Sequence, residues 1–325
     1  MDWGGIFNNA AGWIISPTTI AYALAATGLA VHFGYAGLLN FGVAGFMAIG
    51  AYSYAISILS FGLPWWVGIL IGMVGATVFA LILGIPTLRL RADYLAIVTI
   101  AAAEIVRLLF TSTVFDEWTN SADGLGGYHA GFREANPLPP GEYGFGPWVY
   151  SSDGWWVRLF GLILLAIAVF IVWAVMRSPW GRVLKGIRED EDAVRSLGKN
   201  VFSYKMQALV LGGIFGGFGG VVLALPSAVV PATYMTSLTF YIWTILLLGG
   251  AATVFGPAVG ALIFWVVMAL LDGILPGLAA AGILPISAIQ AGVLRYVFVG
   301  IALMLLVIFR PQGICGNKRE LTFVK

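Results

Sequence analysis

Nine long apolar runs divide this chain, and they constrain its fold more than any other feature. Crossing the hydrocarbon core of a bilayer takes about 20 residues of helix, and only helices and closed barrels satisfy their backbone hydrogen bonds there. The runs therefore predict an all-α, polytopic integral membrane helical bundle of about nine transmembrane helices, with eight to ten possible because 238–275 can be divided differently. The runs are 13–33, 35–59, 65–88, 94–113, 155–176, 206–230, 238–254, 257–275 and 291–309.

Charge is too scarce for a soluble surface. Charged residues make up 10% of the chain and hydrophobic residues 60%, whereas a soluble domain carries roughly a quarter charged residues. Lipid must therefore contact most of the outside. The net charge of +2 does not indicate nucleic acid binding, because the basic residues gather at the ends of the runs. With Cys315 as the single cysteine and only two histidines, neither an internal disulfide nor a metal cluster is expected.

The basic residues between the runs predict the orientation of the bundle. With nine spans, three basic groups fall on one side, which the positive-inside rule assigns to the cytoplasm. The segment 114–154 falls on the other side and holds six acids against one arginine. We predict one transmembrane domain, 1–325, with an outer loop at 114–154, a cytoplasmic hairpin at 177–205 and a cytoplasmic tail at 310–325. The basic groups are Arg89 and Arg91, seven residues of 177–205, and Arg310, Lys318, Arg319 and Lys325.

The segment 177–205, called the charged hairpin below, is densely charged and lies between two predicted spans. Four acids at 189–192 favour a helix start through the helix dipole, and Gly198 is suited to end that helix. Such a hairpin is a part that a soluble protein could push on. A solvated loop is the simplest alternative. A magnesium site for a diphosphate is disfavoured, because the acids are consecutive rather than one turn apart on paired helices.

Glycines interrupt the second run between positions 34 and 50, and Asn40 lies among them. Glycine weakens a helix, and an amide in lipid needs a partner. The pattern predicts a broken helix whose backbone lies against protein or a wet cavity; close helix packing through small residues is the alternative. The glycines of 212–220 recur four apart, which predicts a packing surface. His32, at the end of a run, is expected to form hydrogen bonds at a helix interface.

Glu104 and Arg107 lie inside the fourth run and are three residues apart. They share a helix face and can pair, which offsets the cost of burying either charge alone. Ionisable residues inside spans often mark transport paths. An ion pair that locks this helix against a neighbour is an equal alternative.

Several stretches carry a family resemblance. Asp192-Ala193-Val194, followed by Gly198, resembles the first half of the Glu-Ala-Ala-x-x-x-Gly coupling motif of ATP-binding-cassette (ABC) importer permeases. The wider strings extend the match over most of the chain, and together they resemble the branched-chain amino acid permease family, in the subunit that pairs with a second, related permease. These strings are 178–182, 187–192, 197–201, 35–42 with 48–52, 88–99 with Glu104 and Arg107, and 249–253 with Gly256, Pro257 and Gly260.

The resemblance implies half of an importer in the cytoplasmic (inner) membrane of a bacterium or archaeon. A second, related permease would complete a heterodimer around one path, two cytoplasmic ABC ATPases would grip the charged hairpins, and a periplasmic or extracellular solute-binding protein would deliver cargo. The chain itself would be no enzyme and hold no cofactor or metal. It has no Gly-x-x-x-x-Gly-Lys-Ser/Thr loop for phosphates, so ATP and Mg²⁺ would be bound by the partner ATPases.

Two groups of residues become functional candidates. Asn40, Thr99, Glu104 and Arg107 are expected along the substrate path. Arg188, Glu189, Asp190, Asp192, Ala193 and Gly198 are expected in ATPase coupling.

The expected cargo is a branched-chain or other neutral amino acid, with urea or short-chain amides as the alternative. Two departures bear on this. Ala252 stands where the family usually has glycine, and 120–125 stands where many members have a pair of glycines. A stand-alone ion-coupled transporter is a rival that needs central carboxylates, of which Glu104 is the one strong candidate. A membrane enzyme acting on lipids is disfavoured, because no His-rich or spaced Asp cluster occurs.

Overall fold

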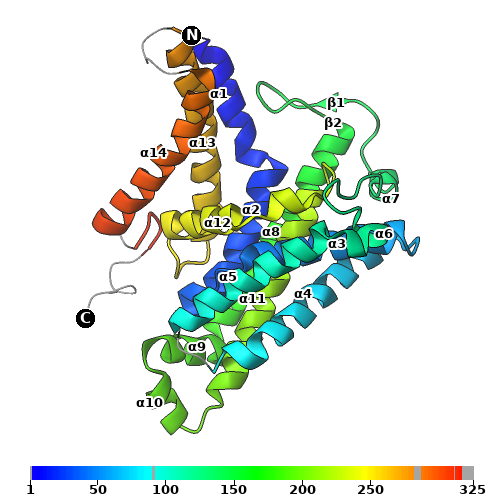
Figure 1. The fold of residues 1–325 in the computed structure, drawn as a ribbon. Helices are drawn as coiled ribbons and strands as arrows, with labels where there is room; N and C mark the ends of the chain where they lie inside the picture. Colours follow the sequence, from blue (N-terminus) through cyan, green and yellow to red (C-terminus); the bar gives the residue numbers. More distant parts are fainter. Residues whose placement is uncertain (1, 90–91, 282–286, 311, 317–325) are drawn as a thin grey trace.

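The protein is described by a computed structural model, which covers residues 2–89, 92–281, 287–310 and 312–316. Its transmembrane part is built from helices (Figure 1). The principal helices are α1 (Trp3–Gly12), α2 (Pro17–Leu29), α3 (Val43–Leu59), α4 (Trp65–Thr87), α5 (Ala92–Thr111), α8 (Ser152–Arg177), α9 (Pro179–Glu189), α10 (Glu191–Ser196), α11 (Val201–Ala224), α12 (Thr236–Gly249), α13 (Gly256–Ala280) and α14 (Ala288–Phe309). Shorter elements are η1 (Trp13–Ile15), the π-helix η2 (Ala30–Tyr35), η3 (Thr113–Phe115), α6 (Asp116–Thr119), α7 (Ala130–Glu134), the hairpin strands β1 (Glu142–Tyr143) and β2 (Tyr150–Ser151), and η4 (Pro231–Tyr234).

The predicted helical membrane bundle is confirmed, and each of the nine apolar runs contains a helix. Five helices in the described part of the chain are long and apolar enough to cross a membrane, and the bent pair Trp3–Ile15 and Pro17–Tyr35 makes a sixth. Two of the nine predicted spans contain helices shorter than a full crossing. α3 has 17 residues and α12 has 14, which gives lengths of about 26 Å and 21 Å, less than a hydrocarbon core of about 30 Å.

The first span differs from its predicted bounds, because helix begins at Trp3 rather than at residue 13. Its two halves meet at a 45° bend. Ser16 at the bend is extended, its hydroxyl accepts from the Thr18 N–H at 3.3 Å, and Pro17 takes the first helical position, where its missing N–H costs nothing. α11 also begins earlier than predicted, at Val201 rather than 206, and ends at Ala224 rather than 230.

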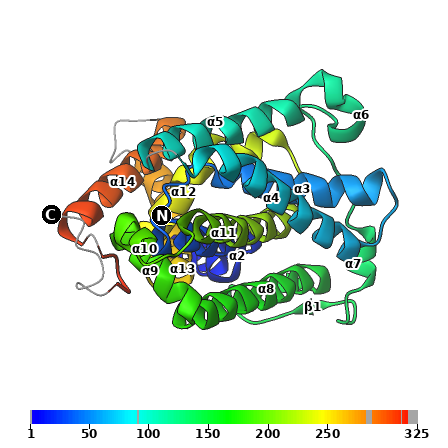
Figure 2. The same ribbon diagram turned by 90° about the horizontal axis from the view of Figure 1, so that it is seen from below.

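The centre of the bundle is formed by α2 and α11, with α5 and α8 on opposite sides of them (Figure 2). The α11 glycines face three neighbouring helices at backbone distance. A Cβ at Gly212 would collide with the Gly28 carbonyl of α2, one at Gly220 with the Met47 carbonyl of α3, and one at Gly217 would press on Ala76 of α4. The prediction of a small-residue packing surface at 212–220 is confirmed, since only glycine permits this approach.

The described basic segments meet at one end of the molecule, where α9 and α10 lie at the bottom of Figure 1. The guanidinium of Arg89 lies 5.7 Å from the centre of the Phe202 ring at the start of α11. The Cys315 N–H donates to the Gly249 carbonyl at 2.9 Å, which ties the C-terminal segment to the end of α12. That the three basic groups share the cytoplasmic side of a membrane stays a prediction. Arg91, Lys318, Arg319 and Lys325 lie outside the described residues.

Candidate functional site

The second predicted span is broken, as its glycines indicated. The π-helix η2 ends at Tyr35, α3 begins at Val43, and 36–42 between them is not helical. We call 36–42 the helix break. Gly37 takes a φ of +69° there, a left-handed conformation that glycine adopts without strain. The break leaves backbone donors within the bundle that need partners.

Side chains from three elements supply those partners. The Gly42 N–H donates to Asn40 Oδ1 at 2.7 Å, within the break itself. The Phe41 N–H donates to Thr99 Oγ1 of α5 at 2.9 Å, and the Ala44 N–H donates to Thr239 Oγ1 of α12 at 3.1 Å. The break is therefore held by hydrogen bonds to α5 and α12 rather than left open.

Asn40 and His32 connect the break to α11. His32 Nε2 lies 3.0 Å from the Leu209 carbonyl oxygen, which can only accept, so Nε2 carries the proton. Nδ1 is then an acceptor for the Asn40 amide, 3.0 Å away. Both side chains are fully buried. The expected interface role of His32 is confirmed, and Asn40 acts here as a clamp within the fold; the sequence suggested it for the substrate path.

Thr99, like Asn40, accepts a hydrogen bond from the backbone of the helix break, whereas Glu104 and Arg107 lie further along α5. The Arg107 Nε donates to both Glu104 oxygens at 3.0 Å. The pair lies within one helix, so it does not lock α5 to a neighbour. The Glu104 side chain is 36% exposed and that of Arg107 18%, on a helix that also exposes Ile97, Ile105 and Leu108. The four suggested path residues thus form two groups: a buried clamp and a partly exposed ion pair.

The charged hairpin folds into two helices, α9 and α10, with Asp190 between them. Asp190 caps α10 by accepting from the Ala193 N–H at 2.9 Å. Gly198 follows the helix with a φ of +76°, the left-handed conformation that commonly ends helices. Both predictions, an acid-led helix start and a glycine stop, are confirmed. Glu191 pairs with Arg195 at 2.9 Å and also with Lys205 of α11, which fixes α10 to the bundle.

Arg188 points inward, toward the transmembrane part. Its Nη1 donates to the Gly34 carbonyl oxygen at 2.5 Å, and its side chain is 15% exposed. Gly34 belongs to the π-helix that leads into the helix break. The sequence suggested Arg188 for ATPase docking together with its acidic neighbours. Its place four residues after buried Leu184 puts it on the inner side of amphipathic α9, a signal that was present in the sequence.

Leu197 is a surface residue that the sequence reasoning missed. It is 79% exposed after the end of α10, and the same hairpin carries the strongly exposed carboxylates of Glu189 (74%) and Asp192 (90%). A single exposed leucine does not by itself mark a contact site, but with these carboxylates it gives the hairpin a surface that is not covered by the rest of the chain. Its only sequence signal was its position between α10 and Gly198. Among the described residues, no group of three or more His, Cys, Asp or Glu could hold a metal ion.

The opposite end carries the segment 114–154. Asn120 and Ser121 have φ values of +52° and +45°, a conformation that costs other residues free energy but not glycine. Glycine would adopt this turn at a lower cost in free energy than Asn120 and Ser121 do. The Asn120 amide donates to the Gly124 carbonyl at 2.7 Å, and the Ser121 hydroxyl donates to Asp116 at 2.6 Å, so side chains stabilise the turn. Burial, together with the charge of Arg133, lowers the pKa of His129 in this segment.

Comparison with known proteins gives a family match over nearly the whole chain. The family model described as "Branched-chain amino acid transport system / permease component" matches residues 14–308. The high-affinity branched-chain amino acid transport system permease protein LivM of Escherichia coli (strain K12) is 31% identical over 270 residues, which cover 77% of this chain and 61% of that protein. The chain thus matches less than two thirds of that relative's length.

Two further relatives show the range of the similarity. The probable branched-chain amino acid transport permease protein LivM of Methanocaldococcus jannaschii is 26% identical over 93% of this chain and 92% of that protein. The guanosine ABC transporter permease protein NupQ of Bacillus subtilis (strain 168) is 27% identical over 65% of this chain and 67% of that protein. Permeases named for two different cargos therefore share this sequence pattern.

Proposed function

The chain belongs to the family of branched-chain amino acid transport system permease components, and from this premise we propose that it is one transmembrane half of an ATP-driven importer. It is embedded in a membrane as a multi-pass helical protein. In the proposed assembly, a second, related permease completes the path, two ABC ATPases dock on the hairpin side, and a solute-binding protein delivers cargo to the other side. The membrane is the cytoplasmic membrane, with the charged hairpin inside the cell.

The contact between Arg188 and the Gly34 carbonyl carries this proposal. The hairpin is exposed at Leu197 and Asp192, where a soluble ATPase can bind it. It contacts the broken second span through Arg188. A force on the tip of α10 is thereby transmitted to η2 and the helix break. The hydrogen bonds of Asn40, Thr99 and Thr239 then pass the movement to α11, α5 and α12. Alternating access of this kind needs a rigid element that rocks as a body.

The partly exposed face of α5 is our candidate for the path and for the second permease. Its Glu104–Arg107 pair is only partly covered by this chain, and neighbouring apolar side chains of α5 are exposed. An ionisable pair on a spanning helix normally faces a bundle interior or a wet cavity. A second permease laid against α5 would provide one. Glu104 and Arg107 are then available to the ends of a zwitterionic amino acid, while Asn40 and Thr99 hold the geometry.

We propose a branched-chain amino acid as cargo, in line with the family description and with the LivM relatives. The test is uptake of radiolabelled leucine into proteoliposomes that hold the chain with its co-purified permease and ATPases, with the binding protein added outside. Unlabelled isoleucine, urea and guanosine serve as competitors. Competition by isoleucine alone supports the proposed cargo, and competition by urea or guanosine alone contradicts it. Uptake by the isolated chain without ATP would overturn the importer assignment itself.

The transmission step has its own test in Arg188→Gln, with Arg182→Gln on the same helix as the matched control. Glutamine at 188 is too short to reach Gly34, so uptake should fall about tenfold, a loss in the range of typical coupling free energies between linked sites. ATPase co-purification should persist, because the docking tip is unchanged. Arg182→Gln makes the same substitution at an exposed position of α9 and should leave both quantities near wild type. Loss of co-purification in Arg188→Gln would instead assign the residue to docking.

Docking itself is tested by Asp190→Lys combined with Asp192→Lys, which reverses two charges on the hairpin. We expect loss of ATPase co-purification or ATP hydrolysis without uptake. Because Asp190 also caps α10, Asp190→Ser with Asp192→Ser separates the effects: serine keeps a capping oxygen and removes the charge. Unchanged uptake and unchanged co-purification in both variants would count against docking at this hairpin.

A further inference from the structure

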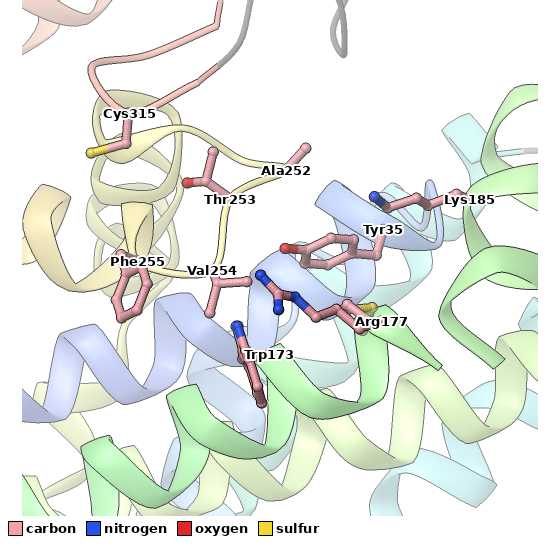
Figure 3. Close-up of a pocket in the computed structure, with 10 residues that line it drawn as sticks. Tyr35, Trp173, Arg177, Lys185, Ala252, Thr253, Val254, Phe255 and Cys315 are labelled. Atoms are coloured by element: carbon pink, nitrogen blue, oxygen red, sulfur yellow. The ribbon is translucent and has the colours of Figure 1, made fainter. Parts of the chain in front are cut away.

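A cavity of about 400 Å³ lies at the hairpin end of the molecule, between α8, α9 and the turn that precedes α13. Its volume falls within the range of about 300–1,000 Å³ found for small-molecule sites. Figure 3 shows Arg177 and Lys185 reaching toward Tyr35 from α8 and α9, across from Thr253 and Val254 of the turn. This cavity is separate from the helix break, from α5 and from the tip of the hairpin.

The lining contains two cations and no acid. Arg177 lies 4.5 Å from the centre of the Trp173 ring, and Lys185 lies 5.9 Å from that of Tyr35. Among the described residues, neither cation forms an ion pair with a carboxylate. The Thr253 hydroxyl is already engaged, since it donates to the Gly250 carbonyl at 2.8 Å and accepts from the Gly256 N–H at 3.0 Å. The binding chemistry is therefore that of an anion held by an arginine and a lysine, as phosphates are.

A second observation indicates which anion this is. An apolar stripe runs along the outer face of α8 and ends at the cavity. Its exposed members recur at helical spacing, and Arg177 follows Trp173 by one turn. Phe170 and Trp173 stack with ring centres 5.8 Å apart, and tryptophans beside a cation are typical of the level where lipid headgroups begin. The stripe consists of Ile163, Ile167, Phe170 and Trp173.

We propose that this cavity binds the phosphate of an anionic phospholipid from the leaflet at the hairpin end, with an acyl chain along the α8 stripe. Basic pockets between transmembrane helices suit such headgroups. Lys185 belongs to α9, so the bound lipid would bridge the end of α8 to the charged hairpin. Anionic lipid would then support the hairpin against the bundle. The inference depends on a membrane-embedded chain and not on the cargo or on the ATPase.

The test is native mass spectrometry of the full chain, purified in detergent and stripped of lipid. Phosphatidylglycerol, phosphatidylcholine with the same acyl chains, and inorganic phosphate are the separate probes. Phosphatidylglycerol should bind most tightly. In Arg177→Gln with Lys185→Gln its affinity should fall about 25-fold, because each basic residue near an anionic headgroup contributes about fivefold. Phosphatidylcholine binding should not change.

The matched control is Arg182→Gln with Lys199→Gln, which removes the same charge from exposed positions at the same end. It should keep wild-type affinity within about twofold, as expected for screened surface charges. Equal weakening in both double variants would overturn the proposal, since the effect would then be general surface charge. Inorganic phosphate binding as tightly as phosphatidylglycerol would overturn the lipid assignment.

A photoactivatable phosphatidylglycerol with the reactive group on its acyl chain provides a readout that does not depend on substitutions. Labelling should map to the α8 peptide that contains Ile167 and Phe170. Labelling only on other helices would overturn the proposal, even if affinity depends on Arg177. If the double variant does not fold, as judged by circular dichroism, Lys185→Gln alone should still lower phosphatidylglycerol affinity about fivefold, and unchanged affinity would contradict the proposal.

Discussion

The helix break and the charged hairpin both depend on polar groups, but the two regions use them under opposite conditions. At the break, Asn40 and His32 are fully buried and each forms hydrogen bonds to a fixed partner. On the hairpin, Asp192 is 90% exposed and pairs with Arg195 at 3.2 Å, where water competes for both charges. Loss of one partner leaves an unsatisfied group in the first case and a hydrated one in the second. Removing one polar side chain should therefore destabilise the protein more at the helix break than on the charged hairpin.

The largest effect is expected where the broken span packs against α11. In Gly220→Ala the new methyl group would collide with the Met47 carbonyl of α3, and backbone cannot move aside cheaply. The free energy of unfolding should fall by about 3 kcal/mol, measured by thermal denaturation in detergent. Gly300→Ala is the control, because a Cβ there meets nothing within 4 Å, and alanine should be neutral or slightly stabilising in a helix. Similar losses in both would remove backbone contact as the cause.

A smaller loss is expected for Asn40→Ala. It leaves the Gly42 N–H without its side-chain acceptor and the His32 Nδ1 without its donor, so stability should fall by about 2 kcal/mol. Asn200→Ala is the exposed counterpart on the hairpin, where Asn200 caps α11; it should cost about 1 kcal/mol. Equal costs at the two asparagines would contradict the distinction between the buried break and the exposed hairpin.

Thr239→Val sharpens the comparison within a single helix. It removes the oxygen that accepts from the Ala44 N–H, and stability should fall by about 1 kcal/mol. Thr244→Val, on the same α12, removes a hydroxyl that only donates to the Phe240 carbonyl of its own helix and should leave the melting temperature unchanged. If Thr244→Val were the more damaging, the hydrogen bond to α3 would not be what holds the break.

The smallest structural effect is expected on the hairpin. Asp192→Asn breaks an exposed pair with Arg195, and such pairs add little to stability. The melting temperature should not change measurably, at low or at high salt. Uptake in the assembled importer, by contrast, should respond if Asp192 touches an ATPase. A large fall in melting temperature would mean that the exposed pair stabilises the fold as the buried polar groups of the helix break do.

The sequence by itself determined the helical membrane class, the approximate place of each apolar helix and the family. It also determined where the second hairpin helix starts and stops. These follow from short-range physics: lipid requires internal backbone hydrogen bonds, acids favour helix starts, and glycine permits a left-handed stop. Asp190 and Gly198 could be read correctly because their partners lie within a few residues. The packing role of the glycines at 212–220 could likewise be predicted, because their spacing alone defines a contact face.

Only the tertiary structure decided which polar groups meet. Asn40 contacts His32, which in turn bonds to Leu209, 177 positions further along the chain, and Arg188 reaches back 154 positions to Gly34. Such pairings depend on how helices pack and where they bend, which no local pattern encodes. The short lengths of α3 and α12 were hidden for the same reason: hydropathy records which residues tolerate lipid, while the packing of neighbouring helices decides where each helix stops.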